Sequence, residues 1–387
     1  AAPVSSPRSV PPLGDLLDQL SEEPSIEAAL GRREPVIAVA DPGRAFVIAG
    51  LVAASDRRPV LVGTPTQAEA ERLAADAGTI LGDDNVMHFP AWETLPFERV
   101  SPGFETMGQR LAALDRLTSD HPPSLVVASA RALIQRIDPH AAIDPIEVRP
   151  GDQVDPVELV EQLVMLGYRR EGQVEHRGEV AVRGSIVDVY PSTADAPVRI
   201  DLWGDEVERL TEFAVADQRS TEPVESVRIY PCREFRPTEA RQARAAELVA
   251  EEPWGREQWD RFADGTLFDG MESWLPWLVE GEHLITDLIG ADGLVAFVEP
   301  RRLRDRAAEI LAEEADLAST LALTWDVAAD DVHRLHLDFD RLMTRTGAAS
   351  WWILATPDKP TTAVVAASGW EPVGGDLSPP SSPSRSL

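Results

Sequence analysis

The chain has 387 residues, 43% of them hydrophobic, and a formal net charge of −30 at pH 7. This length predicts two or three domains, each large enough to bury its own core. The acidic balance disfavours nonspecific binding to duplex nucleic acid, because lysine and arginine supply most of that affinity. The single cysteine, Cys232, excludes an intrachain disulfide and a multi-cysteine metal site.

Residues 1–25 are predicted to be an N-terminal extension with a first helix, and residues 26–140 an α/β domain. Apolar runs and helical periodicity alternate in this domain, with strands at 36–40, 59–63 and 125–128 and helices at 45–54, 67–77, 104–117 and 130–137. Strands that alternate with helices predict a parallel sheet. In the helix at 104–117, Gln109 and Arg110 are interpreted as surface residues without a role.

The segment from Ala38 to Ala45 joins the first predicted strand to the first of these helices, where a phosphate-binding loop GxxxxGK[ST] would lie. Gly43 is the residue that still matches this pattern. Ala38 replaces the first glycine, Arg44 the lysine that reaches the terminal phosphates, and Ala45 the hydroxyl that binds magnesium. Pro42 removes a backbone N–H from the loop. The sequence therefore predicts a degenerate loop that binds no cofactor.

Residues 141–232 are predicted to form a second, mainly antiparallel β domain. Apolar and polar residues alternate between 167 and 220, so that Ile200 and Leu202 point to one face and Asp201 to the other. Gly184 and Gly204 mark the reversals expected in a meander. The polar face carries charges of both signs, and the pattern alone leaves open whether it is a solvated surface or a binding surface.

Residues 233–343 are predicted to be a helical and α/β segment that completes the first unit. Thr238 is expected to cap a helix at 239–250, and a strand at 293–298 is followed by a helix at 300–316. Four tryptophans are expected in the core rather than at a ligand site, namely Trp254, Trp259, Trp274 and Trp277. Residues 344–387, rich in Pro, Ser and Gly, are predicted to be a linker or a truncated further domain, partly disordered.

No apolar stretch approaches membrane-spanning length, and the start of the chain lacks a secretion signal, so we expect a cytoplasmic location. The histidines show no metal-site spacing. His333 and His336 lie three residues apart, but no third ligand is evident, so the sequence indicates no metal site.

The run from 167 to 220 closely resembles the second domain of the repair protein UvrB and of the transcription-repair coupling factor Mfd, in the blocks GYRR, EHRGE, AVRG, VDVYP and VRIDLWGDEVERL. The resemblance implies a degenerate RecA-like, P-loop-like parallel-sheet unit split by an inserted antiparallel domain, as in the 1a-2-1b arrangement of UvrB. Two departures favour Mfd. The phosphate loop is degenerate, and the short segment 89–102 leaves no room for the DNA-clamping hairpin of UvrB.

The Mfd resemblance implies a non-catalytic N-terminal module that recruits UvrA to stalled RNA polymerase in transcription-coupled nucleotide-excision repair. By similarity Arg183 and Asp201 match positions that contact UvrA, with Arg169, Arg170 and Arg199 as neighbouring candidates. RNA polymerase, DNA, ATP and Mg are expected to bind other parts of the full-length protein, whose C-terminal domain is expected to contact this module.

Two alternatives stay open, a UvrB-type DNA-damage-binding protein and a weak nucleotide hydrolase. Neither is favoured by the residues. The DNA-binding alternative needs the clamp hairpin and a basic groove, whereas the hydrolase needs the phosphate lysine, the magnesium hydroxyl and a DEAD-like acidic box after a strand, which does not occur here.

Overall fold

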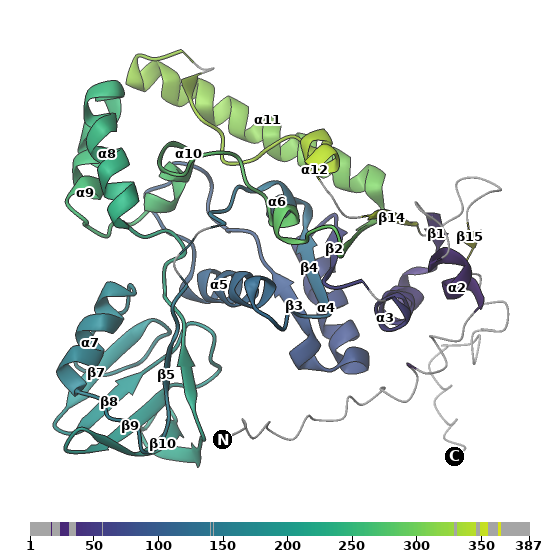
Figure 1. Ribbon diagram of the computed structural model, residues 1–387. Helices are drawn as coiled ribbons and strands as arrows, with labels where there is room; N and C mark the ends of the chain where they lie inside the picture. The colour runs from purple at the N-terminus through teal and green to yellow at the C-terminus, as the bar shows by residue number, and fades with distance from the viewer. Residues whose placement is uncertain are drawn as a thin grey trace, which may run out of the picture.

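The computed structural model describes residues 17, 24–30, 36–55, 57–139, 141, 143–328, 331–345, 349–354 and 363–364. Most of the predicted N-terminal extension, residues 1–25, lies outside this set, as does most of the tail that follows residue 354. Figure 1 shows three parts of the described chain: a central α/β unit, an antiparallel β unit and a helical unit.

Within the described residues, the α/β unit is built on a seven-stranded sheet whose neighbouring strands are all parallel. In spatial order the strands are β15 (Ala363–Val364), β1 (Val36–Ala38), β14 (Ala349–Leu354), β13 (Leu294–Val298), β2 (Val60–Thr64), β4 (Leu125–Ser129) and β3 (Val86–Phe89). The strands β1, β2, β4 and β13 were predicted, and the return of β13 to the first sheet is confirmed.

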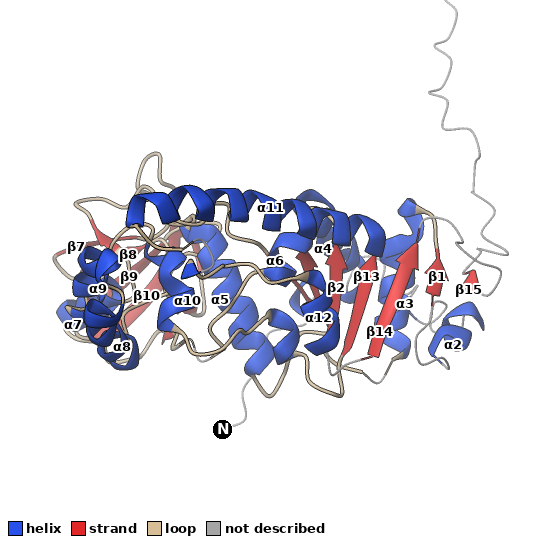
Figure 2. Cartoon of the chain, turned by 90° about the horizontal axis from the view of Figure 1, so that it is seen from above, coloured by secondary structure: helices blue, strands red, loops and turns tan. Residues whose placement is uncertain are grey.

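Helices cover both faces of this sheet (Figure 2). One face packs against α2 (Pro24–Leu30), α3 (Arg44–Ala54) and α4 (Gln67–Leu81), and the other against α5 (Phe104–Thr118), α6 (Ala130–Ile134), α11 (Pro300–Trp325) and α12 (Phe339–Arg345). Strand β2 shows why both faces are apolar: Val60 and Val62 enter the first core, and Leu61 enters the second.

The structure corrects the prediction for residues 344–387. Residues 349–354 form β14, which lies between β13 and β1 and pairs with both. The prediction was wrong for this segment because the Pro, Ser and Gly content of the whole tail conceals one short apolar run, Trp351 to Leu354. Ile353 is fully buried in the core beside α3, so this strand belongs to the first sheet and not to a further domain.

The antiparallel unit is inserted between β4 and β13. Its six-stranded sheet, within the described chain, runs in the order β11 (Ser220–Pro223), β10 (Glu206–Phe213), β9 (Val198–Trp203), β8 (Ile186–Val189), β7 (Glu179–Arg183) and β6 (Arg169–Arg170). Only β6 pairs in parallel there. A second small sheet joins β5 (Ile146–Val148) to β12 (Val227–Ile229). The predicted fold class, an α/β unit split by a mainly antiparallel domain, is confirmed.

Helix α7 (Pro156–Met165) covers one face of the six-stranded sheet. Its N-cap is Asp155, whose carboxylate accepts hydrogen bonds from the backbone N–H groups of Val157 and Glu158. The alternating residues Val198, Ile200 and Leu202 of β9 point into this core, as the sequence pattern predicts. Within the described part of the chain, α7 packs against this core face, and loops rather than a helix lie on the opposite face.

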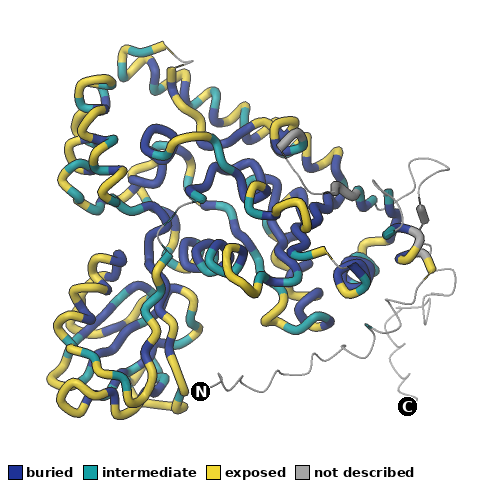
Figure 3. Tube along the Cα trace, in the orientation of Figure 1, coloured by how far each residue is buried: buried dark blue, intermediate teal, exposed yellow. Residues whose placement is uncertain are grey.

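The helical unit comprises α8 (Glu239–Glu251), α9 (Arg256–Ala263) and α10 (Leu275–Leu278), packed against the far end of α11. Thr238 caps α8 as predicted, accepting a hydrogen bond from Arg241 N. The tryptophans Trp259, Trp274 and Trp277 are buried here, which confirms their core assignment. Figure 3 shows the resulting distribution, with buried residues through the central sheet and exposed ones along the outer turns of α8 and α9.

A buried arginine joins the α/β unit to the end of the antiparallel unit. Arg110 of α5 is 0% exposed, and its guanidinium donates to both carboxylate oxygens of Glu234, at 2.5 Å from Nε and 3.0 Å from Nη2. Its Nη1 donates to Pro90 O at 2.8 Å and to Gln135 Oε1 at 3.1 Å, and Trp92 Nε1 donates to Glu234 at 2.9 Å. The interpretation of Arg110 as a surface residue was therefore wrong, because this side of α5 packs against Pro90 and Gln135 of its own unit and against Glu234.

The thiol of Cys232 lies in the core of the antiparallel unit, and burial raises its pKa to about 12 from an ordinary value of 9.0. The unfolded chain therefore ionises this thiol at a lower pH than the folded chain, so the stability that Cys232 contributes is complete below pH 9 and falls as the pH rises toward 12. We expect Cys232→Ala to flatten the fall in unfolding free energy between about pH 9 and 11, measured by urea titration. If the unfolding free energy fell equally with pH in the unmodified chain and in Cys232→Ala, this expectation would be wrong.

Candidate functional site

The face of the six-stranded sheet opposite α7 gathers the charged residues of the predicted binding run. Strand register places Arg183 opposite Ile186, and Asp188 opposite Arg199, so these side chains share one face. Asp201 also lies opposite Ile186 and belongs to the same face. We call this the outer face of the antiparallel sheet.

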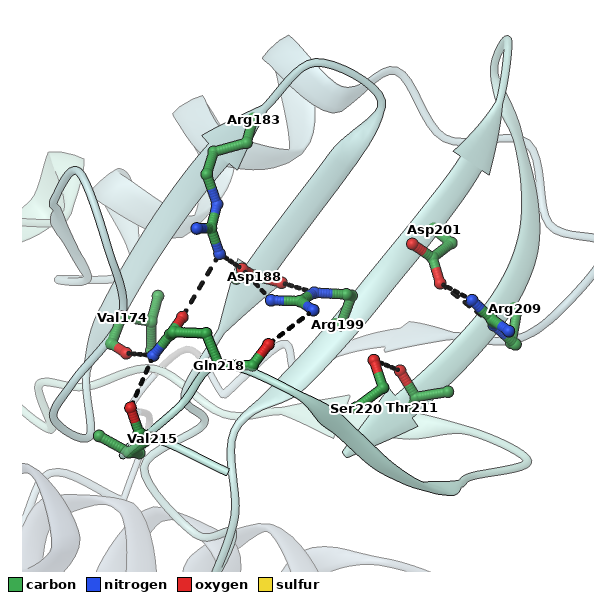
Figure 4. A network of polar contacts seen from close by, with 10 residues as sticks. All are labelled: Val174, Arg183, Asp188, Arg199, Asp201, Arg209, Thr211, Val215, Gln218 and Ser220. Atoms are coloured by element: carbon green, nitrogen blue, oxygen red, sulfur yellow. Dashed lines mark hydrogen bonds and ion pairs between the residues drawn. The ribbon is translucent and has the colours of Figure 1, made fainter. Parts of the chain in front are cut away.

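Asp188 is the centre of a polar network on the outer face (Figure 4). It is 0% exposed, and Arg199 binds it with two parallel hydrogen bonds, 2.7 Å from Nε to Oδ1 and 2.9 Å from Nη2 to Oδ2. Arg183 Nη2 donates to Oδ2 of the same carboxylate. A buried carboxylate held by two guanidinium groups fixes the position of both arginines.

The loop after β10 closes over part of this network. Gln218 has a φ of 61°, and its side-chain amide donates to Val174 O at 3.1 Å and to Val215 O at 3.0 Å. Arg199 Nη1 donates to Gln218 O at 3.1 Å, while its guanidinium carbon lies 4.8 Å from the centre of the Phe213 ring. Arg199 is consequently half-buried, and its guanidinium is held by groups of this chain.

Several side chains of the outer face remain open to solvent. Arg183 keeps 43% of its side chain exposed, and Trp203, at the end of β9, is 80% exposed. Arg209 is exposed and donates to Asp201 Oδ2 at 2.8 Å from Nη2 (Figure 4). Asp201, the acidic partner in this ion pair, is half-buried. The outer face thus presents an exposed indole beside two arginines with fixed orientation.

The structure separates the predicted site residues. Arg183, Arg199 and Asp201 lie together on the outer face, whereas Arg169 and Arg170 are exposed on β6 at the edge of the sheet. The Arg169 guanidinium lies 5.2 Å from the ring centre of Phe104 in α5. None of these contacts tests a role in binding, so the five assignments stay predictions. Asp188, Arg209 and Trp203 were not predicted as site residues.

The degenerate phosphate loop follows β1 as predicted, with a 3₁₀ turn at Asp41–Gly43 before α3. Arg44 forms ion pairs with Asp41 and with Glu299, the latter at 2.6 Å from Nη2 to Oε1. Glu299 follows β13, so a carboxylate of this chain binds the guanidinium at the position of the lost lysine. A phosphate that approached Arg44 would meet the negative charges of Asp41 and Glu299.

Among the described helices, none combines the length and the apolar character needed to cross a membrane. Likewise, the described part of the chain contains no group of three or more His, Cys, Asp or Glu residues placed to hold a metal ion.

Comparison with known proteins places this geometry in a family. Residues 146–235, which contain the whole outer face, match the UvrB interaction domain family. The transcription-repair-coupling factor of Mycobacterium tuberculosis is 33% identical over 381 residues, covering 89% of this chain and 30% of the relative. The chain is an N-terminal UvrB-like module of the transcription-repair-coupling factor family.

Other relatives are similar over a shorter range. The coupling factor of Escherichia coli is 32% identical over 234 residues, 56% of this chain and 19% of the relative. The UvrABC system protein B of Thermotoga maritima is 26% identical over 235 residues, 57% of this chain and 35% of its own length. The chain therefore spans less than a third of the length of these coupling factors.

Proposed function

We propose that this chain is a non-catalytic docking module of a cytoplasmic transcription-repair-coupling factor, which recruits UvrA to stalled RNA polymerase in transcription-coupled nucleotide-excision repair. The observation that carries the proposal is the outer face: Arg183 and Trp203 are exposed on a rigid sheet inside the part that matches the UvrB interaction domain family. RNA polymerase, DNA, ATP and Mg would bind other parts of the full-length protein, whose C-terminal domain would contact this module.

The outer face has the physical properties of a docking surface. Asp188 holds Arg183 in place before a partner arrives, so less side-chain entropy is lost on binding. Asp188 accepts from Nη2 of Arg183, so the N–H groups of Nη1 are available for a carboxylate or carbonyl of UvrA. Trp203 adds a large apolar surface next to these charges, and tryptophan and arginine are the residues most enriched at interface centres.

A titration of the purified chain with UvrA tests the proposal. We expect Arg183→Glu and Asp201→Arg each to weaken binding by about tenfold, because each reverses a charge at the interface. Arg256→Glu is the matched control, since Arg256 is an exposed arginine on α9, away from the outer face. Undiminished binding by both outer-face variants would remove this surface from the proposal.

The alternative of nucleotide hydrolysis makes an opposite prediction. A site with ATP at about 100 times its Kd would stabilise the chain by about 2.7 kcal/mol, a shift of several degrees in melting temperature. We expect no shift and no ATP turnover at millimolar Mg-ATP, because Glu299 binds Arg44 and Ala45 has no hydroxyl. We expect the same of Glu299→Gln, which removes the carboxylate charge. A shift in either chain would revive nucleotide binding.

A further inference from the structure

A second polar site lies in a pocket of about 360 Å³ between α11, α12 and the loop that precedes α12. Three arginines line it, Arg136, Arg334 and Arg341, together with His333 and His336, against the two carboxylates of Glu282 and Asp338. This local excess is unusual in a chain whose formal net charge is −30. The pocket is part of the α/β unit, and neither the outer face nor the degenerate loop contributes to it.

The backbone fixes two of these residues. Residues 335–337 pair with residues 134–136 through Arg136 N to Leu335 O at 2.9 Å and Leu337 N to Ile134 O at 2.8 Å. This pairing places His336 opposite Gln135 and next to Arg136. Arg136 and Arg341 both bind Glu282, at 2.8 Å for Arg136 Nη2 to Oε1, so one carboxylate orients two guanidinium groups.

His336 carries the strongest indication of a ligand. It is 2% exposed, and its Nδ1 lies 2.9 Å from Oε2 of the buried Glu314. Glu314 also accepts from Leu335 N at 2.6 Å and from His336 N at 3.2 Å. Because an ionised carboxylate only accepts, the proton of the imidazole lies on Nδ1. The other nitrogen, Nε2, is buried without a hydrogen-bond partner in the described chain.

A buried polar atom without a partner is uncommon in folded proteins, and His336, whose Nε2 is such an atom, is one of the residues that line this pocket. The ring centre of His333, another lining residue, lies 5.0 Å from that of Trp277, and burial lowers the pKa of this histidine. The three arginines of the lining outnumber its two carboxylates, which favours an anionic ligand over a metal ion.

We propose that this pocket binds a phosphate group, as the free ion or as the terminal group of a small phosphomonoester. Phosphate matches both parts of the lining. Its oxygens accept from the planar guanidinium of Arg334 and from the arginines around Glu282. Its protonated oxygen donates to a neutral His336 Nε2, and an ionised oxygen accepts from a protonated one, so the contact forms in either state of the imidazole.

The test observes the imidazole nitrogens of the unmodified 387-residue chain by NMR during titration with inorganic phosphate, with ionic strength held constant by chloride. We expect a saturable shift of the His336 Nε2 resonance, assigned by its loss in His336→Gln. Arg334→Glu should weaken binding by at least about tenfold. Arg334 is exposed and contacts no carboxylate among the described residues, so this change should leave the fold intact.

Arg219→Glu is the control for a general effect of charge, since Arg219 is an exposed arginine in the antiparallel unit. It should bind phosphate as the unmodified chain does. A parallel titration with a nucleoside monophosphate separates the two sources, because tighter binding of the ester identifies a phosphomonoester and tighter binding of the ion identifies free phosphate. An unmoved His336 resonance with both probes, or equal weakening by Arg219→Glu, would overturn the proposal.

Discussion

Replacing Arg110 by alanine is expected to lower the free energy of unfolding by about 3–5 kcal/mol, the range for breaking a buried ion pair. The change leaves the carboxylate of Glu234 buried without its guanidinium, and it removes the donors to Pro90 O and Gln135 Oε1. The Arg110 guanidinium also packs 4.2 Å from the centre of the Phe89 ring, so apolar contact is lost as well. Urea unfolding monitored by tryptophan fluorescence measures the loss.

The neighbouring change Gln109→Ala is the matched control for Arg110→Ala. Gln109 lies on the same helix, and among the described residues its side chain bonds to the exposed Glu105 alone, so we expect a loss of less than about 0.5 kcal/mol. A double-mutant cycle with Glu234→Gln isolates the pair, because the second change should cost far less once Arg110 is absent. A loss below about 1 kcal/mol for Arg110→Ala would show that the pair does not hold the units together.

The Arg110–Glu234 pair also determines how the antiparallel unit is held against the α/β unit. Glu234 lies at the end of the part that matches the UvrB interaction domain family, and Arg110 lies in the helix that covers the central sheet. The buried pair therefore fixes the antiparallel unit on the α/β unit. Arg233 forms a second such tie, at 3.1 Å to the buried Glu272 and 2.7 Å to Asp269. These two ties hold the antiparallel unit, and with it the outer face, in a set direction relative to the other units of this chain.

The sequence could indicate part of this arrangement. Arg110 falls at helical spacing with Met107, Leu111 and Leu114, all buried, so the periodicity of α5 does mark it as a residue of the buried side. Its partner could not be found in this way, since Glu234 lies 124 residues further along the chain. Strand β3 was not predicted because it has only four residues and His88 interrupts its apolar side chains. Such a short segment shows no clear alternation of apolar and polar residues.

The candidate site, too, could be predicted from the sequence only in part. Alternation in β9 and the family resemblance are sufficient to place Arg183 and Asp201 on one face. They do not show that Asp188 is buried on that face, because its burial depends on cross-strand register and on the loop that carries Gln218. The burial of most of the Arg199 side chain could not be predicted for the same reason. Alternation identifies the side of the sheet, whereas the loop decides which residues on that side reach solvent.

We expect Trp203→Ala to weaken UvrA binding by about 2–4 kcal/mol, a larger effect than that of either charge reversal. Trp203 is 80% exposed at the end of β9, and an indole of this size left in water is costly unless a partner covers it. Because the indole makes few contacts in the free chain, the change should leave the melting temperature unaltered. Titration of UvrA by calorimetry measures the loss directly.

Leu323→Ala is the matched control for Trp203→Ala, since Leu323 is another exposed apolar residue, 86% exposed on α11 and outside the outer face. Its loss should not change UvrA binding. If both variants bind as the unmodified chain does, Trp203 lies outside the contact and the charges of Arg183 and Arg209 remain as the candidates. If Trp203→Ala alone loses binding while Arg183→Glu does not, the interface centres on the indole at the end of β9, and the Asp188 network serves to hold that strand rigid.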